Sequence, residues 1–164
     1  TQCEELSHAR RRRMSHVNRS SPSVGAQALG YGGLIPFVGL ALAVWSMPAH
    51  QAVAASALLA YCATIVSFLG AIHWGLTMRD ATGQSTPMLV WGVFPSLLAW
   101  VALLLPVATG MVLLAVLLWA CFAVDRRTYP RLGLRAWLPM RLLLTTIASL
   151  SCIATAVRLT GAAW

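Results

Sequence analysis

Apolar residues in this chain gather into five long segments separated by short polar connections. The segments lie at residues 29–47, 53–78, 88–105, 108–124 and 142–161. A helix that crosses the hydrocarbon core of a bilayer, about 30 Å thick, needs about 20 mostly apolar residues. Four segments reach about that length, and 108–124 is slightly shorter. The pattern therefore predicts an all-α integral membrane protein with five transmembrane helices.

The apolar runs favour helices over the strands of a membrane barrel. Val112–Leu118 is apolar at every position, whereas barrel strands alternate with a period of two. The composition agrees, because 59% of the residues are hydrophobic and 10% are charged, whereas a soluble domain carries about 25% charged residues. We expect one transmembrane domain over residues 29–161, preceded by a flexible, basic cytoplasmic tail over residues 1–28.

The distribution of arginine predicts the orientation of the chain. All twelve Lys or Arg positions are arginine, and all but Arg158 fall in the tail, the second connection or the fourth connection. Cytoplasmic loops carry such an excess, so we expect a cytoplasmic N-terminus and a C-terminus on the opposite side. The arginines expected at the membrane surface, against anionic lipid headgroups, are Arg79, Arg126, Arg127, Arg131, Arg135 and Arg141.

A formal net charge of +8 is also typical of proteins that bind nucleic acid. Here the charge lies at the membrane borders, where it sets topology, so we expect no nucleic-acid partner. Within residues 126–140, Arg131 and Arg135 can share one helical face. The apolar residues Leu134 and Trp137 can share another, which predicts a short interfacial helix before the last span.

Small residues recur at every fourth position of the second segment. Such a repeat predicts a face that a neighbouring helix can approach closely. Packing within the molecule is favoured over dimerisation. The predicted packing residues are Ala63, Ser67, Ala71 and Gly75.

Two prolines inside the predicted helices, Pro36 and Pro95, each remove a backbone donor and predict a kink. The rise of a helix places both kinks at about the depth of His73, in the cytoplasmic third of the bilayer. Broken backbone at that depth needs a polar partner or a cavity. We therefore expect a small polar pocket near the inner leaflet, lined by His73, Tyr31, the carbonyls of Gly32 and Trp91, Ser96 and Thr145.

Two roles for His73 remain open. A neutral histidine can bond one neighbouring carbonyl or hydroxyl and fix helix packing, and an ionisable residue inside a span can also bind a ligand or carry a proton. A single histidine is a poor metal site. The nearby carboxylates, Asp80 and Asp125, adjoin arginines and are expected to pair with Arg79 and Arg126 at the interface.

The sequence contains no Gly-rich phosphate loop, no serine–histidine–carboxylate set and no paired carboxylates for acid–base chemistry. Cys62, Cys121 and Cys152 lie in separate segments without a Cys-x-x-Cys partner, so we expect buried small residues rather than a disulfide or metal framework. A haem held by two histidines of one chain is excluded, since His73 is the one histidine inside a segment. We expect no enzyme, no metal and no cofactor.

Three stretches carry a family resemblance: Gly33–Phe37, Tyr61–Gly75 and Trp91–Leu98, with weaker similarity at Asp125 and Arg141–Thr145. Over residues 29–158 the chain resembles an uncharacterised bacterial family of multi-helix membrane proteins that is related to mitochondrial transmembrane protein 69. The resemblance implies a membrane protein of the bacterial inner membrane or of mitochondria, and of the two we expect the bacterial inner membrane. It implies no catalytic residue.

The leading functional prediction is a non-catalytic accessory or structural subunit of a larger membrane complex, such as a respiratory one, with other membrane-protein subunits as partners. It rests on the small size, the small-residue repeat and the basic tail. The alternative is a transporter or channel for a small solute or lipid-like molecule, with a pocket around His73. Such a protein would have to oligomerise, because five helices are few for a transporter. A third interpretation is an enzyme that acts on a lipid or a quinone.

Overall fold

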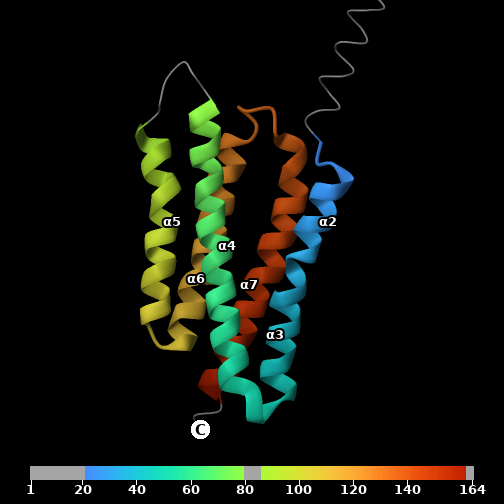
Figure 1. Ribbon diagram of the computed structural model, residues 1–164, viewed down its shortest axis with the longest axis vertical. Helices are drawn as coiled ribbons and strands as arrows, with labels where there is room; N and C mark the ends of the chain where they lie inside the picture. The colour runs from blue at the N-terminus through green and yellow to red at the C-terminus, as the bar shows by residue number, and fades with distance from the viewer. Residues whose placement is uncertain (1–20, 80–85, 162–164) are drawn as a thin grey trace, which may run out of the picture.

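The computed structural model describes residues 21–79 and 86–161, which form an elongated helical bundle (Figure 1). Five of its helical segments are long and apolar enough to cross a membrane, which confirms the predicted class. The first segment is divided into α2 and α3, and short 3-10 turns precede α4 and α7. The elements are α2 (Val24–Gly32), α3 (Leu34–Ser46), η1 (Pro48–His50), α4 (Gln51–Arg79), α5 (Thr86–Leu104), α6 (Val107–Thr128), η2 (Arg135–Trp137) and α7 (Leu138–Gly161).

Two boundaries differ from the sequence prediction. The first span begins at Val24, before residue 29, and so takes in part of the predicted tail. Its N-terminus is capped by Ser23, whose hydroxyl accepts a hydrogen bond from the backbone N–H of Ala26 at 3.2 Å. The predicted interfacial helix is a single 3-10 turn that runs directly into α7.

The first span breaks at Gly33, three residues before Pro36, the proline at which the sequence predicts a kink. Pro36 lies in the first turn of α3 and cannot donate to the carbonyl of Gly32. The carbonyl of Gly33 accepts a hydrogen bond from the hydroxyl of Tyr61 on α4, at 2.9 Å. The helix break is therefore supported by a bond to the neighbouring span, as irregular backbone inside a membrane requires. In contrast, α5 continues through Pro95 without a break.

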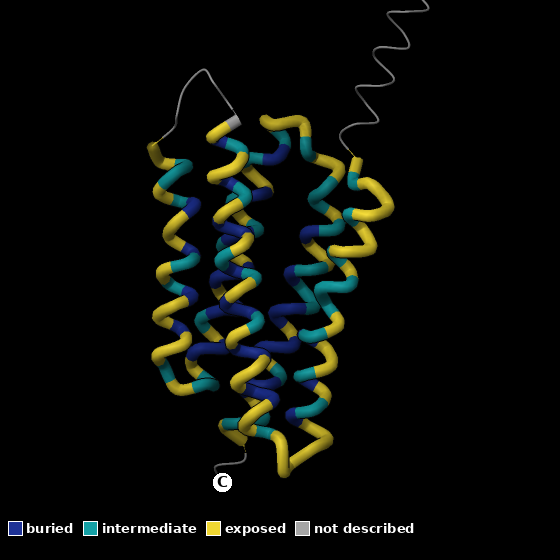
Figure 2. Tube along the Cα trace, viewed as in Figure 1, coloured by how far each residue is buried: buried dark blue, intermediate teal, exposed yellow. Residues whose placement is uncertain are grey.

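The helix α4 organises the bundle. It packs mainly against α3, α5 and α6 and also touches α7, while α7 packs mainly against α3 and α6. The shortest connections join antiparallel neighbours, with α5 at one edge of the bundle and α2 and α3 at the other (Figure 1). Buried positions lie mainly on the sides of the helices that face one another, and exposed positions lie mainly on the outer sides (Figure 2). Leu58, Met111 and Leu114 are among the fully buried side chains of this core.

The close approach of α4 to α5 does not follow the predicted small-residue repeat. The first two members of the repeat are buried or half-buried, but Ala71 and Gly75 are exposed. A step of four residues turns by about 40° beyond one full turn of a helix, so such a repeat winds away from a packing face. Gly70 takes the close position instead: a Cβ atom there would lie 2.5 Å from the carbonyl oxygen of Gly92.

Replacing Gly70 by alanine should therefore destabilise the bundle. We expect Gly70→Ala to lower the free energy of unfolding by about 1–3 kcal/mol, because α4 and α5 must separate to admit the methyl group. Gly75→Ala is the matched control, since a Cβ there would meet nothing within 4 Å. It should stabilise the helix by about 0.5–1 kcal/mol. Thermal unfolding in detergent measures both, and equal midpoints for the two variants would contradict this packing.

The bundle also makes a prediction about topology. With five spans, α2 begins at the opposite end of the bundle from the end of α7 (Figure 1). Together with the arginine distribution, this predicts that a C-terminal reporter enzyme active only outside the cytoplasm is active in a bacterial host. A reporter active only inside should be inactive at that position, and the reverse pair of results would contradict the predicted orientation.

Candidate functional site

A buried ion pair joins the end of α6 to the start of α7. Arg141 donates a hydrogen bond from Nε to Oδ2 of Asp125 at 2.8 Å, and its Nη2 donates to the same oxygen. Asp125 is 1% exposed and Arg141 is 7% exposed. Because the two partners satisfy one another away from water, they tie the two helices together at this end of the bundle.

A third ionisable group comes from α4. Nε2 of His73 lies 3.4 Å from Oδ1 of Asp125. Nδ1 of the same ring lies 3.4 Å from the carbonyl oxygen of Leu69. Since His73 is 1% exposed, the carboxylate of Asp125 lies between a guanidinium group and an imidazole. We refer to Asp125, Arg141 and His73 as the ion cluster; it brings together α4, α6 and α7.

The ion cluster corrects two assignments made from the sequence. Arg141 is not at the membrane surface against headgroups, and Asp125 does not pair with Arg126, which is exposed. The reason is the tight turn after α6, in which the N–H of Leu134 donates to the carbonyl of Tyr129 at 2.8 Å. This turn returns the chain so that the first turn of α7 packs beside the last turns of α6. Asp80 and the side chain of Arg79 lie outside the described residues.

Among the described residues, the polar groups next to the ion cluster add no second negative charge. Tyr129, which follows α6, is buried near Arg141 and Asp125. Burial, together with the charge of Asp125, raises the pKa of its phenol, so the phenol stays neutral at physiological pH. On α4, the hydroxyl of Thr77 donates to the backbone carbonyl of His73 at 2.8 Å. The neighbouring polar groups therefore support the cluster as neutral partners.

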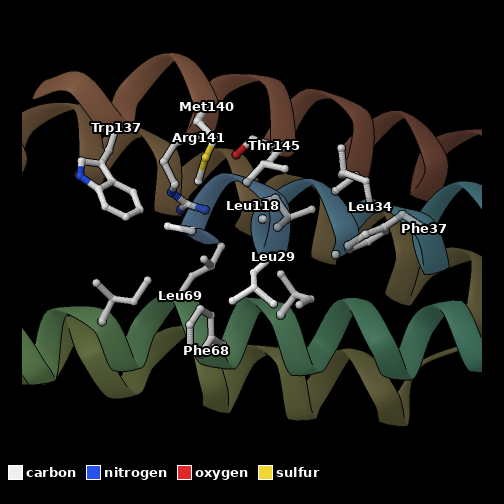
Figure 3. Close-up of a pocket in the computed structure, with 17 residues that line it drawn as sticks. Leu29, Leu34, Phe37, Phe68, Leu69, Leu118, Trp137, Met140, Arg141 and Thr145 are labelled. Atoms are coloured by element: carbon white, nitrogen blue, oxygen red, sulfur yellow. The ribbon is translucent and has the colours of Figure 1, made fainter. Parts of the chain in front are cut away.

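An apolar cavity of about 390 Å³ lies beside the ion cluster (Figure 3). Its walls come from α2, α3, α4, α6 and α7, together with Trp137. Arg141 and Thr145 are the polar side chains of the lining. Leu29 and Phe68 also line the cavity, yet they are 82% and 61% exposed. The cavity therefore opens sideways between α2 and α4, toward the surrounding lipid.

The cavity differs from the polar pocket that the sequence predicts. Thr145 lines it, but His73 lies in the ion cluster rather than in the cavity wall. Tyr31 is 43% exposed on α2, and a Cβ atom at Gly32 would meet nothing within 4 Å. Neither of these predicted residues of the first span lines the cavity.

The predicted pocket residues of α5 lie apart from those of the first span. Trp91 and Ser96 are half-buried on α5, and the indole N–H of Trp91 has no hydrogen-bond partner among the described residues. Since α5 lies at the opposite edge of the bundle from α2 and α3 (Figure 1), the helix break near Pro36 and the proline of α5 do not form one site. The two prolines are expected at a similar depth in the membrane, but a similar depth on separate helices does not bring residues into contact.

The thiols are buried between helices and show no metal-binding arrangement. Sγ of Cys62 on α4 lies 3.6 Å from Sγ of Cys152 on α7, and both are free, as is Cys121. Across residues 21–79 and 86–161, no group of three or more His, Cys, Asp or Glu side chains could hold a metal ion. Of the features described here, the ion cluster and the adjoining cavity are the strongest candidates for a functional site.

The fold defines a multi-pass helical membrane protein. A family model described as Protein of unknown function (DUF3429) matches residues 23–157, and the chain belongs to that family. The match spans the ion cluster and the cavity. The chain is also similar to Transmembrane protein 69 of Xenopus tropicalis, with 38% identity over 78 residues, which are 46% of this chain and 31% of that protein. No solved structure matches. These findings confirm the resemblance recognised in the sequence.

Removing one partner of the ion pair should cost far more stability than removing both. We expect Asp125→Leu to lower the free energy of unfolding by about 3–5 kcal/mol, because Arg141 is left buried without a counter-charge. The double variant Asp125→Leu/Arg141→Met should recover most of that loss. Reversible unfolding in detergent measures the difference.

Arg126→Met is the control for this experiment, because Arg126 is exposed. Its effect should stay within about 0.5 kcal/mol. Additive losses in the double variant, with no recovery, would contradict a direct pair between Asp125 and Arg141.

Proposed function

We propose that this protein is a non-enzymatic membrane protein that binds and holds a lipid-like molecule in the cavity beside Arg141. The observation that carries the proposal is the cavity itself, about 390 Å³ of apolar space built from several spans. Ligand sites in proteins are typically clefts of about 300–1,000 Å³ with apolar walls and a few placed polar groups. The cavity has both properties.

The direction of the opening supports a ligand that comes from the bilayer. Leu29 and Phe68 stand at the lipid-facing side of the cavity, so a lipid-like molecule can enter without crossing water. An ion or a polar solute would lose its hydration against walls such as Phe37 and Leu118, at a cost of several kcal/mol. The lining therefore favours an apolar or amphipathic ligand over a small polar solute.

The proposed location is the bacterial inner membrane, in the orientation that the arginine pattern predicts. On this proposal, the exposed arginines after α6 lie against anionic headgroups on the cytoplasmic side. They are Arg126, Arg127, Arg131 and Arg135. The interpretation as an accessory subunit of a larger complex stays a prediction, and it is compatible with a bound lipid.

A substitution that fills the cavity tests the proposal. Ala26 lines the cavity, whereas Ala28 is exposed on the same helix. Ala26→Trp should weaken binding of an 18-carbon monoacylglycerol by at least about tenfold, since the indole occupies space that the acyl chain needs. Native mass spectrometry of the purified protein in mild detergent, titrated with the lipid, gives the occupancy.

Ala28→Trp is the matched control and should bind like the unsubstituted protein. The proposal is overturned if added amphiphiles show no saturable binding at one molecule per chain. It is also overturned if the two tryptophan variants bind equally well.

A further inference from the structure

The polar end of the cavity restricts the chemistry of the ligand. We propose that the ligand has a neutral head group that presents a carbonyl oxygen, as an acyl ester or a quinone does, to Arg141. This inference rests on the proposed function, because it concerns the head group of the molecule that the cavity holds.

The first argument is the supply of hydrogen-bond donors. The Arg141 guanidinium group points toward the cavity (Figure 3). A guanidinium group has five N–H donors and no acceptor, and those of Nε and Nη2 are directed at Oδ2 of Asp125. A ligand with an acceptor oxygen at this end of the cavity can share these N–H donors with Asp125, whereas a hydrocarbon cannot.

The hydroxyl of Thr145 marks the same end of the cavity. Thr145 is 2% exposed and lines the cavity, and its Oγ1 has no hydrogen-bond partner within the described part of the chain. The adjacent Thr146 differs, because its hydroxyl donates to the carbonyl of Leu142 at 2.9 Å. A buried hydroxyl without a partner costs about 1–3 kcal/mol. A carbonyl group in the cavity would offer it an acceptor.

The second argument is the balance of charge. The positive charge of Arg141 is already compensated by Asp125, and His73 approaches the other carboxylate oxygen. A carboxylate or phosphate head group would place a second anion beside Asp125 and would lose its hydration in an apolar cavity. A neutral carbonyl accepts from the same donors and adds no charge. The cluster thus favours a neutral head group over an anionic one.

The shape of the lining sets the direction of the bound molecule. Trp137 and Arg141 stand toward one end of the cavity, and Leu34 and Phe37 line the other (Figure 3). The head group therefore lies near the start of α7. The apolar chain extends along α3 or leaves through the opening beside Phe68.

Four probes with the same chain length test the head group. They are a monoacylglycerol, an alkyl quinone, a fatty acid at a pH where it is ionised, and an alkene without an acceptor. Native mass spectrometry of the full chain in mild detergent gives their relative affinities. We expect the ester or the quinone to bind at least about tenfold more tightly than both the fatty acid and the alkene. The stronger of the two shows whether the cavity prefers an ester or a quinone as the carbonyl source.

Two sets of variants assign the preference to the polar end. Thr145→Val keeps the side-chain volume and should weaken ester binding by about fivefold, while Thr146→Val should leave it unchanged. In the double variant Asp125→Leu/Arg141→Met, the preference for the ester over the alkene should fall to about fivefold, the part that Thr145 contributes. Alkene binding should persist in that variant, which shows that the cavity is intact.

The possible failures are distinguishable. If the fatty acid binds most tightly, or if the double variant keeps the full ester preference, the neutral-carbonyl inference is wrong and lipid binding stands. The same holds if all four probes bind equally. If none of the probes shows saturable binding, the proposed function fails as well.

Discussion

A carboxylate inside an apolar bundle persists as a charged group only when a partner compensates it, and Asp125 has such a partner in Arg141, with the ring of His73 beside its other oxygen. Each of the three residues comes from a different helix, so the one charge fixes how α4, α6 and α7 meet. The same constraint positions the guanidinium group at the edge of the cavity. The stability of the bundle at this end and the polarity of the cavity therefore have a common origin.

The five spans could be predicted from the apolar runs because membrane thickness sets a minimum length for any crossing helix. The start of the first span could not be predicted in this way, because Ser23 caps α2 and extends it in front of the apolar run. The small-residue repeat of α4 failed for a geometric reason. A helix has 3.6 residues per turn, so each step of four turns about 40° past a full turn and three steps carry Gly75 about 120° around the helix from Ala63. Gly70 rather than Gly75 meets the neighbouring helix.

The sequence contains a spacing signal for the ion cluster, but the neighbouring arginines obscure it. On α6 a spacing of four and three residues links Leu114, Leu118, Cys121 and Asp125, all of which are buried. On α7 the same kind of spacing links Arg141 to Thr145 and Ala148. These phases place both charged residues on inward faces. Because Arg126 and Arg127 follow Asp125 directly, the sequence pattern instead predicts that Asp125 lies at the membrane interface. The cavity left no such signal, because its volume depends on the helix break at Gly33 and on side chains from several spans.

The most direct test of the ion cluster is a distance measured in a bilayer. Solid-state NMR of the full chain, with ¹³C in aspartate and ¹⁵N in arginine, can detect the contact between the Asp125 carboxyl group and the Arg141 guanidinium group. We expect a coupling that corresponds to a nitrogen–oxygen approach within about 4 Å, and its loss in Arg141→Met. A guanidinium group of Arg141 that couples instead to lipid phosphorus, with no contact to Asp125, would contradict the buried cluster.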